Sequence, residues 1–492
     1  MQGQYELRPY QREILRKVEW EFERGNNRVM MQLATGAGKT GIAAEWSKLH
    51  GGKALFLCHT LSVIGQLPEE MRHWGVDVVP VGQEYLAWRT AETRLERVGV
   101  SCMFFKSTIE NAAVACTPRT AFNNISGAED MRQFTCVIVD EAHHAADSAL
   151  GEDPTLASQL VSLAAQAGIP VLGITATPWR MSRLQGFSQT WQSLVEGADW
   201  IDLRTEWLAD PVLKTITDTM RITGTGDRAG YDYTESETTL ANLSNPIFVD
   251  RVFQIIRKLN GIEAGKDSKT IIYAVGQVHA LKVALASLKE PNIRAGLLVS
   301  SSEIQNQAAS YGIETNPNRI RKQLLSGQLN TIINVNMVTE GYDCPDVDTI
   351  CCLRPTLSLA LWRQICGRGS RLTDDKKVVH IIDLTDNHER LGSPLDKYPW
   401  SLEPRGETGQ VGQAWMRNCE PGYGRWSCGG QMFVGSHHCP NCEEPQGQVC
   451  ERCGKFRFWN RYNAVELFHE HYADQPLECD FCVASRQYRL RI

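Results

Sequence analysis

The sequence lacks the features that would place it in a membrane, in a secreted class or among repeat proteins. No apolar run approaches the roughly 20 residues that a membrane-spanning helix needs. Residues 1–6 do not combine a basic start with an apolar stretch, so no secretion signal is indicated. Long repeats and low-complexity tracts are also missing. We therefore expect a cytoplasmic protein, without a membrane partner, in a compartment that keeps thiols reduced.

A large excess of charge of one sign is missing as well. The formal net charge is −6, and a field of this sign does not attract a polyanion. A nucleic-acid partner would therefore bind to local basic patches. What the sequence does have is length and apolar material, because 492 residues, 42% of them hydrophobic, are enough for about three globular domains.

Short apolar runs alternate with helical patterns over residues 1–204. The expected helices cover 7–24 and 39–50, and the expected strands cover 28–33, 53–58, 135–139 and 171–175. Runs that are apolar on both faces are typical of a parallel sheet with helices on both sides. The first segment is therefore predicted to be a doubly wound α/β domain.

Residues 205–245 turn polar, which predicts an irregular connection. A second alternation follows over 246–400, with expected helices over 246–259 and 281–288 and expected strands over 270–274, 295–299, 331–335 and 378–383. Two α/β domains joined by a linker indicate a ligand site in the cleft between them. In the last segment, 401–492, the periodicity gives way to glycine, cysteine and aromatic residues.

The motif Gly36-Ala37-Gly38-Lys39-Thr40 lies between a predicted strand and a predicted helix. Its glycines allow the loop backbone to close around phosphate oxygens, towards which the first N–H groups of the helix point. Lys39 is expected to reach the β- and γ-phosphates, and the Thr40 hydroxyl to bind magnesium. A leucine replaces the first glycine of the longer form of this motif, and a turn without ligand is the alternative. The strand before the loop and the helix after it favour a nucleoside triphosphate site.

Two adjacent carboxylates follow the apolar strand expected over 135–139. The C-terminal ends of such strands are where α/β folds bind their ligands. Asp140 is predicted to hold magnesium, and Glu141 to orient and activate the attacking water. His143 is predicted to couple the γ-phosphate to the rest of the cleft. An isolated Asp-Glu pair would more often begin a solvated helix, but together with Lys39 it indicates catalysis.

These two motifs together resemble the superfamily 2 helicases of DEAH-box type. Further segments resemble the helicase motifs in the expected order: 7–11 the Q motif, 57–66 loosely motif Ia, 175–178 motif III, 339–343 motif V and 364–371 motif VI. Residues 7–11 and 354–358 resemble the branch of the RadD-like proteins and the type I and III restriction motors. The resemblance covers about residues 5–400 and implies two RecA-like parallel-sheet domains in tandem.

The resemblance also implies roles for individual residues. Gln11 would read adenine, and motif V would place Gly341 and Asp343 at the nucleotide. Thr175 and Thr177, in motif III, would link hydrolysis to the nucleic-acid track. The implied cofactors are ATP and magnesium.

Arg368 and Arg371, in motif VI, are spaced so that both lie on one face of a helix or turn. Across the cleft from Lys39, an arginine that neutralises transition-state charge accelerates hydrolysis by roughly 10³ to 10⁵. We interpret Arg371 as this arginine finger and Arg368 as its partner at the γ-phosphate. In isolation the pair would be read as surface arginines. The finger on the second domain implies that hydrolysis requires the cleft to close.

Half of the 16 cysteines crowd the last segment in paired spacings. They form two sets of four, Cys419, Cys428, Cys439 and Cys442, and Cys450, Cys453, Cys479 and Cys482. Four thiolates suit a closed tetrahedral zinc site, so two zinc ions in a small ribbon-like module are predicted. His437 or His438 is an alternative ligand in the first set, and ligands interleaved between the two sites are another alternative. The segment is too poor in apolar residues to fold without such a staple.

Cations alternate with aromatic residues around Arg457 and Trp459, which is typical of a surface that neutralises phosphates while bases stack. Ordinary packing of a zinc ribbon with a charged face explains the pattern equally well. We expect the segment to grip nucleic acid.

The function predicted from these patterns is that of an ATP-dependent DNA helicase or translocase, acting in DNA repair, recombination or phage and host DNA metabolism. The alternatives are a double-strand translocase that never separates strands, an ATP-switched nucleic-acid clamp and an RNA helicase. The expected partner is single-stranded or branched duplex DNA, with RNA left open. No nuclease constellation remains in the sequence, so a nuclease or a repair or replication factor is expected as a separate protein partner.

Overall fold

The computed structural model describes two α/β domains and four short strands near the C-terminal end. The described residues are 5–82, 113–146, 154–180, 186–215, 252, 253, 256, 268–290, 292–335, 346–374, 376–385 and 387–404, together with β14 (Met416–Asn418), β15 (Gln431–Phe433), β16 (Gly447–Val449) and β17 (Phe456–Phe458). The helix expected over 246–259 lies almost entirely outside these residues.

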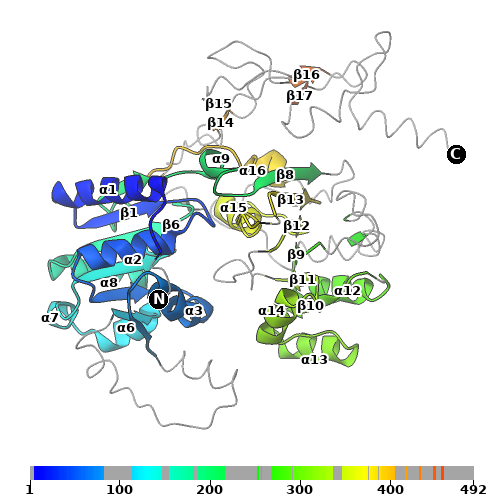
Figure 1. Cartoon of the computed structure of the whole chain (residues 1–492), viewed down its shortest axis with the longest axis horizontal. Coiled ribbons are helices and arrows are strands. Elements are labelled where there is room, and N and C mark those ends of the chain that lie inside the picture. The colour runs from blue at the N-terminus through cyan, green and yellow to red at the C-terminus, as the bar shows by residue number, and fades with distance from the viewer. Residues whose placement is uncertain are drawn as a thin grey trace.

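The first domain is built on a parallel sheet (Figure 1). Its strands, in spatial order, are β3 (Val78–Pro80), β4 (Ala113–Cys116), β2 (Ala54–Leu57), β5 (Cys136–Asp140), β6 (Val171–Thr175), β1 (Arg28–Gln32) and β7 (Ser193–Glu196). Its helices are α1 (Pro9–Glu23), α2 (Lys39–Leu49), α3 (Leu61–His73), α6 (Pro118–Asn124), α7 (Ala128–Met131), η1 (Ala142–His144), α8 (Leu156–Gln166) and α9 (Trp200–Leu203).

The second domain repeats this plan with a parallel sheet of its own. The spatial order of its strands is β10 (Ala295–Leu298), β11 (Thr331–Asn334), β9 (Thr270–Tyr273), β12 (Thr349–Cys352), β13 (Val378–Asp383) and β8 (Asp210–Thr215). Its helices are α12 (Gln277–Ser287), α13 (Ser302–Ser310), α14 (Pro317–Leu325), α15 (Leu359–Gly367) and α16 (Asn387–Leu391).

Alternation along the strands explains why both sheets are covered on both faces. In β1, Met30 packs into one core cluster, whereas its neighbours Val29 and Met31 pack into another on the opposite face. In β9, Ile271 and Ile272 are divided between two clusters in the same way. Strands that are apolar on both sides require helices on both sides. The doubly wound α/β fold predicted from sequence is therefore confirmed for each domain.

The connection expected to be irregular over 205–245 differs from the prediction at its start. Residues Asp210–Thr215 form β8, which pairs in parallel with β13 at the edge of the second sheet. The polar residues of this strand, Asp210, Lys214 and Thr215, reflect its edge position, where one side faces no further strand. The predicted linker therefore included a strand that belongs to the second sheet. Residues 216–250 lie outside the described part.

The helix α15 lies between the two sheets, and it connects them physically (Figure 1). One apolar cluster runs from the first sheet through Trp200 and Leu208 to Trp362 of α15, so the core continues across the domain boundary. No helix in the described ranges is long and apolar enough to cross a membrane. The fold thus places the end of α15 against the loop that precedes α2.

Candidate active site

The loop between β1 and α2 has a backbone that its glycines allow. Gly36 (φ 80°) and Gly38 (φ 77°) are left-handed, a conformation that residues with a Cβ adopt at a cost. The helix α2 begins at Lys39 directly after Gly38, so the N–H groups of its first turn open towards the loop. Thr40 is the second residue of this helix. A loop of this form at a helix N-terminus can bind the phosphates of a nucleotide.

Lys39 lies within electrostatic range of four other charged side chains of the site. Its Nζ donates to a backbone carbonyl just after β1, at 3.4 Å. Burial lowers the pKa of Lys39, Glu141 and Asp140 raise it, and Arg368 and Arg371 lower it again. Charged groups from both domains therefore lie within electrostatic range of one ammonium group. The structure brings together the five residues that the sequence assigned to catalysis.

The carboxylates of the site sit at the C-terminal end of β5. Asp140 is the last residue of this strand, and Glu141 follows with φ 47°. Among the described non-glycine residues, only Glu141 and Thr205 have a positive φ. A left-handed glutamate costs on the order of 1 kcal/mol, and such strain clusters at functional sites. It turns the chain sharply after β5 and leaves the Glu141 carboxylate 14% exposed and 3.3 Å from Nδ1 of His143.

His143 joins the carboxylates to the end of the neighbouring strand β6. Its Nδ1 lies 2.9 Å from Oγ1 of Thr175, at hydrogen-bond distance. The same Thr175 oxygen accepts from the N–H of Thr177, at 3.1 Å. Both threonines are buried. Glu141 and Thr175 therefore both lie close to the same imidazole nitrogen, which places Glu141 beside the segment after β6.

Gln11 is bound to the loop rather than turned towards a ligand. Its Nε2 donates to the carbonyl oxygens of Ala37 and Gly38, at 3.0 and 3.1 Å. Its Oε1 accepts from the N–H of Arg8, at 2.8 Å, and the side chain is 3% exposed. In this conformation both ends of the amide hold the protein itself. Reading of adenine by Gln11 thus remains a prediction, and it requires the amide to exchange partners.

Tyr10, Trp207 and Arg8 form a cluster beside Gln11 that no sequence pattern predicted. The Tyr10 hydroxyl donates to the carbonyl oxygen of Ala37 at 2.7 Å, and the Tyr10 ring lies 5.8 Å from that of Trp207. The Arg8 guanidinium stacks over Trp207, 4.8 Å from the ring centre. Trp207 comes from the connection that leads to β8, far from α1 in sequence, which is why spacing alone did not find the group.

The second domain contacts the loop through the end of α15. The Ser370 hydroxyl donates to the carbonyl oxygen of Thr35 at 2.9 Å. A Cβ on Gly367 would lie 2.6 Å from Cβ of Thr35, and a Cβ on Gly36 would lie 2.5 Å from Oγ of Ser370. Both glycines are therefore required for this close approach. The side chain of Arg371 starts at the same place, with its Cγ 3.5 Å from the Cβ position of Gly36.

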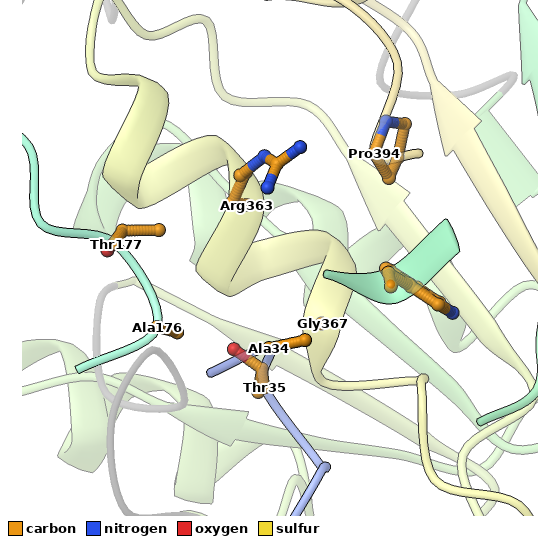
Figure 2. Close-up of a pocket in the computed structure, with 8 residues that line it drawn as sticks. Ala34, Thr35, Ala176, Thr177, Arg363, Gly367 and Pro394 are labelled. Carbon is orange, nitrogen blue, oxygen red and sulfur yellow. The ribbon is translucent and has the colours of Figure 1, made fainter. Parts of the chain in front are cut away.

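Arg363, which the sequence motifs did not single out, completes the wall of the cleft. Figure 2 shows a small pocket where Thr35, Thr177, Arg363 and Gly367 converge. Arg363 on α15 is 3.3 Å from Asp199, which follows β7 in the first domain. A signal for Arg363 was available, because it lies on the buried stripe of α15 with Leu359 and Gly367, four residues away on either side. A charge on such a stripe needs a partner.

Several predicted site residues lie outside the described residues. These are Gly341 and Asp343, Trp459, His437 and His438, and the cysteines Cys419, Cys428, Cys439, Cys442, Cys450, Cys453, Cys479 and Cys482. Arg457 lies in β17, which pairs in antiparallel fashion with β16. The described parts of the chain contain no group of His, Cys, Asp and Glu that could hold a metal ion. The two zinc sites therefore stay predictions.

The first domain matches a known family. Residues 4–180 match the family described as the res subunit of type III restriction enzymes. A 51.5 kDa protein of a Lactococcus phage is 27% identical over 436 residues, which cover 86% of this chain and 77% of the phage protein. IRC3 of Saccharomyces cerevisiae, assigned as an ATP-dependent helicase, is 23% identical over 390 residues, which cover 77% of this chain and 51% of the yeast protein.

Restriction enzymes recur among the similar proteins. The EcoKI type I restriction endonuclease subunit of Escherichia coli is 22% identical over 454 residues, which cover 82% of this chain and 36% of that subunit. Among solved structures, a fragment assigned as the HsdR subunit of a type I restriction enzyme from Vibrio vulnificus superposes with a TM-score of 0.51 at 17% identity. That superposition covers 80% of this chain and 67% of the fragment, and it supports the tandem RecA-like fold. The chain is thus similar to the res subunit family over residues 4–180 and, over most of its length, to proteins described as ATP-dependent helicases and restriction-enzyme subunits.

Proposed function

We propose that the chain hydrolyses ATP in the cleft between its domains to move along, or remodel, DNA. One observation carries the proposal. Lys39 of the first domain is electrostatically coupled to Asp140 and Glu141 beside it and to Arg368 and Arg371 of the second domain. The groups proposed as phosphate clamp, base and arginine finger therefore lie within electrostatic range of one ammonium group and come from two domains, which supports the proposal.

The proposed reaction uses the first domain to hold the nucleotide. The loop N–H groups and Lys39 bind the phosphates, while Thr40 and Asp140 offer the hydroxyl and carboxylate oxygens that magnesium prefers. When bound, magnesium would neutralise charge on the β- and γ-phosphates. Glu141, held by its strained backbone, orients a water and takes its proton as the water attacks the γ-phosphorus. Arg371 and Arg368 stabilise the charge on the γ-phosphate oxygens as the bond to ADP breaks.

Coupling of hydrolysis to movement follows from the position of His143 between the ends of β5 and β6. His143 is near both the proposed base, at 3.3 Å, and Thr175, at 2.9 Å. Thr175 in turn fixes the backbone of Thr177. A shift of Glu141 during hydrolysis would therefore be transmitted to the segment after β6, which the family resemblance assigns to the nucleic-acid track.

DNA is the polymer that the comparisons favour. The similar proteins include a type I restriction endonuclease subunit, and the matching family is a subunit of type III restriction enzymes. The chain spans only about half of the yeast relative and about a third of the EcoKI subunit, so the activities of those whole proteins are not carried over. Roles in repair, recombination or phage and host DNA metabolism, and a separate nuclease or replication partner, remain part of the proposal.

The polymer is tested by the rate of ATP hydrolysis in the presence of single-stranded DNA, duplex DNA, branched DNA and RNA of equal length. We expect DNA to stimulate the rate well above the level seen with RNA. Stimulation by RNA alone would make the chain an RNA helicase.

The mode of action is tested by displacement of a labelled strand and, in parallel, of a triplex-forming strand. Release of both indicates a helicase, and release of the triplex strand alone indicates a duplex translocase. Stimulated hydrolysis without release of either strand indicates an ATP-switched clamp and would overturn the proposed movement.

We further propose that the last segment binds two zinc ions and contributes Arg457 and Trp459 to DNA binding. The support is the spacing of its eight cysteines and the alternation of cations with aromatic residues. Chelation is expected to release two equivalents of zinc from the purified protein and to leave nucleotide binding by the first domain intact. Exchange of Arg457 and Trp459 for alanine is expected to weaken DNA binding and to reduce its dependence on salt.

A further inference from the structure

Arg363 is a buried and multiply bonded side chain on the face of α15 that meets the first domain. One terminal nitrogen lies 3.3 Å from Oδ1 of Asp199, and the other donates to the backbone carbonyl of Asp396. Its guanidinium also stacks on Tyr398, 4.2 Å from the ring centre, and lies 5.5 Å from the ring of Trp400. The side chain is therefore held in place from both domains.

Asp199 is tied just as firmly to the strand that leads into the nucleotide loop. Its Oδ1 accepts from Nε2 of Gln32, the last residue of β1, at 3.1 Å. The residue before it, Ala198, accepts a backbone hydrogen bond from Ala34 at 3.1 Å. One carboxylate oxygen thus receives hydrogen bonds from the root of the loop and from α15 of the other domain.

Spacing along α15 shows what this pair can position. Arg363 and Gly367 are four residues apart and lie on one face of α15, and Ser370 follows three residues after the end of the helix. Gly367 packs on Thr35, and Ser370 donates to the carbonyl oxygen of Thr35. Three successive contacts, the first of them ionic, fix how far α15 is rotated and advanced against the loop. Arg368 and Arg371 follow from the same stretch of chain.

Stability alone is a poor explanation for such a pair. Both side chains are only 10% exposed, so each charge has lost most of its water. Burial raises the pKa of Asp199, and Arg363 acts against this shift. A buried ion pair of this kind contributes little net stability compared with apolar residues of the same size, although loss of one partner is costly. The pair instead defines where α15 lies relative to the first domain.

We propose that Asp199 and Arg363 are positioning residues for hydrolysis: their buried ion pair sets the register of α15 against the nucleotide loop and so aims Arg371 and Arg368. This inference rests on the role proposed above for Arg371. It assigns to two residues outside the helicase motifs a function in catalysis that acts through other side chains.

The experiment compares four variants of the full chain by their kcat and KM for ATP with DNA at saturation. Arg363→Met keeps the length of the stem but removes the charge, and Asp199→Asn changes only one atom. The double variant removes both charges. Lys397→Ala is the matched control, because Lys397 pairs with Asp202 across the same domain boundary at 2.6 Å, with both side chains more than a third exposed.

We expect each single variant to lower kcat by about 100-fold, the effect of a displacement of about 1 Å at a catalytic group. The KM for ATP is expected to change by less than about three-fold, since the loop itself is intact. The control is expected to change kcat by less than about five-fold, as for other exposed ion pairs. The double variant should fall no further than the worse single variant, because the two residues act as a unit.

Different outcomes would overturn the inference. A folded Asp199→Asn variant with a normal kcat would do so, even if Arg363→Met failed to fold. Losses that multiply in the double variant, or a rise in KM without a fall in kcat, would show that the residues do not act as one positioning device. Arg371→Ala separates the two proposals: if it hydrolyses ATP normally, the proposed finger is wrong, whereas an inactive Arg371→Ala beside an active Arg363→Met refutes only the positioning role.

Discussion

The two walls of the cleft are built by different physical means. On the first domain the loop is shaped by its own backbone, through Gly36 and Gly38 and the start of α2 at Lys39. On the second domain the end of α15 is placed by side chains that reach across the boundary, from Ser370 to Thr35 and from Arg363 to Asp199.

This difference has a functional meaning. A backbone-shaped loop keeps its form whether or not the domains are in contact, so it can bind nucleotide at any stage of a cycle. A wall placed by cross-boundary contacts exists only when the domains meet. In the proposed function, binding is thus expected of the first domain alone, and hydrolysis only of the two domains together. Substitutions on one wall at a time separate nucleotide binding from hydrolysis.

The substitution Lys39→Ala is expected to abolish nucleotide binding by the loop of the first domain. Without its ammonium group the loop loses the charge that faces the β- and γ-phosphates, so ATP binding and turnover should disappear together. Fluorescent-nucleotide titration and a phosphate-release assay measure the two properties. Lys17→Ala is the control, because Lys17 pairs with Glu13 on the exposed side of α1. Nucleotide affinity within a few-fold of normal would contradict the assignment of Lys39.

The substitution Arg371→Ala is expected to disable only the second wall. The rate of hydrolysis should fall by roughly 10³ to 10⁵, the contribution of an arginine finger. The affinity for ATP should stay close to normal, because the loop is unchanged. Arg319→Ala, at an exposed position of α14 in the same domain, should leave both quantities unaltered. Equal losses of binding and turnover would mean that the two walls are not separable in this way.

The substitution Glu141→Gln is expected to stop the chemistry with both walls in place. Loss of a general base typically costs 10² to 10⁴ in rate, and the isosteric amide should preserve ATP binding. The protein should therefore accumulate on DNA in the nucleotide-bound state, as measured by slowed dissociation from a labelled strand in the presence of ATP. Normal turnover by this variant would mean that another group activates the water.

Alkaline pH is expected to lower the free energy of unfolding of both domains, because each core contains buried thiols. Six buried thiols lie in the described residues, three in each domain. Burial raises the pKa of Cys116 and of Cys136 to about 12, and it also raises that of the others. In the unfolded chain these thiols ionise near pH 9, so the native state retains protons that the unfolded state releases.

Stability should therefore fall as the pH rises from about 9 towards 12, by at most about 1.4 kcal/mol per pH unit for each thiol. Lys376 acts in the opposite sense between about pH 8 and 10.5, because burial lowers its pKa to about 8, and Lys39, whose pKa burial also lowers, acts with it, but they are two groups against six. Urea denaturation at pH 8.5 and 10.5 measures the difference. A free energy of unfolding that is constant or rises over this interval would refute the prediction.

The periodic parts of the fold could be predicted from sequence. Strands such as β6, which the apolar run over 171–175 predicts with its correct bounds, and helices such as α2 are local in origin. The edge strand β8 was missed because a strand with one open side carries polar residues and does not show a continuous apolar run. Its partner β13 lies more than 160 residues further along the chain, and local patterns carry no information about such pairing.

The candidate site shows the same division. Lys39, Asp140 and Glu141 sit at junctions between a strand and the next element, so their place in the site could be predicted from neighbouring residues, and the roles proposed for them rest on the same pattern. Asp199 has no motif around it, and its importance arises only when α15 is brought against it. Gln11 shows the limit of reading by resemblance, because its amide is occupied by the loop in this conformation.

The strand β8 has a mechanical consequence. The chain leaves α9 at Leu203 and enters the second sheet at Asp210, so only six residues separate elements that belong to different domains. Six residues span at most about 20 Å when fully extended. The second domain is therefore on a short tether at this point, anchored by a strand rather than by a free linker. With Thr205 in a left-handed turn inside it, this short connection limits how far the two domains can separate at this edge of the second sheet.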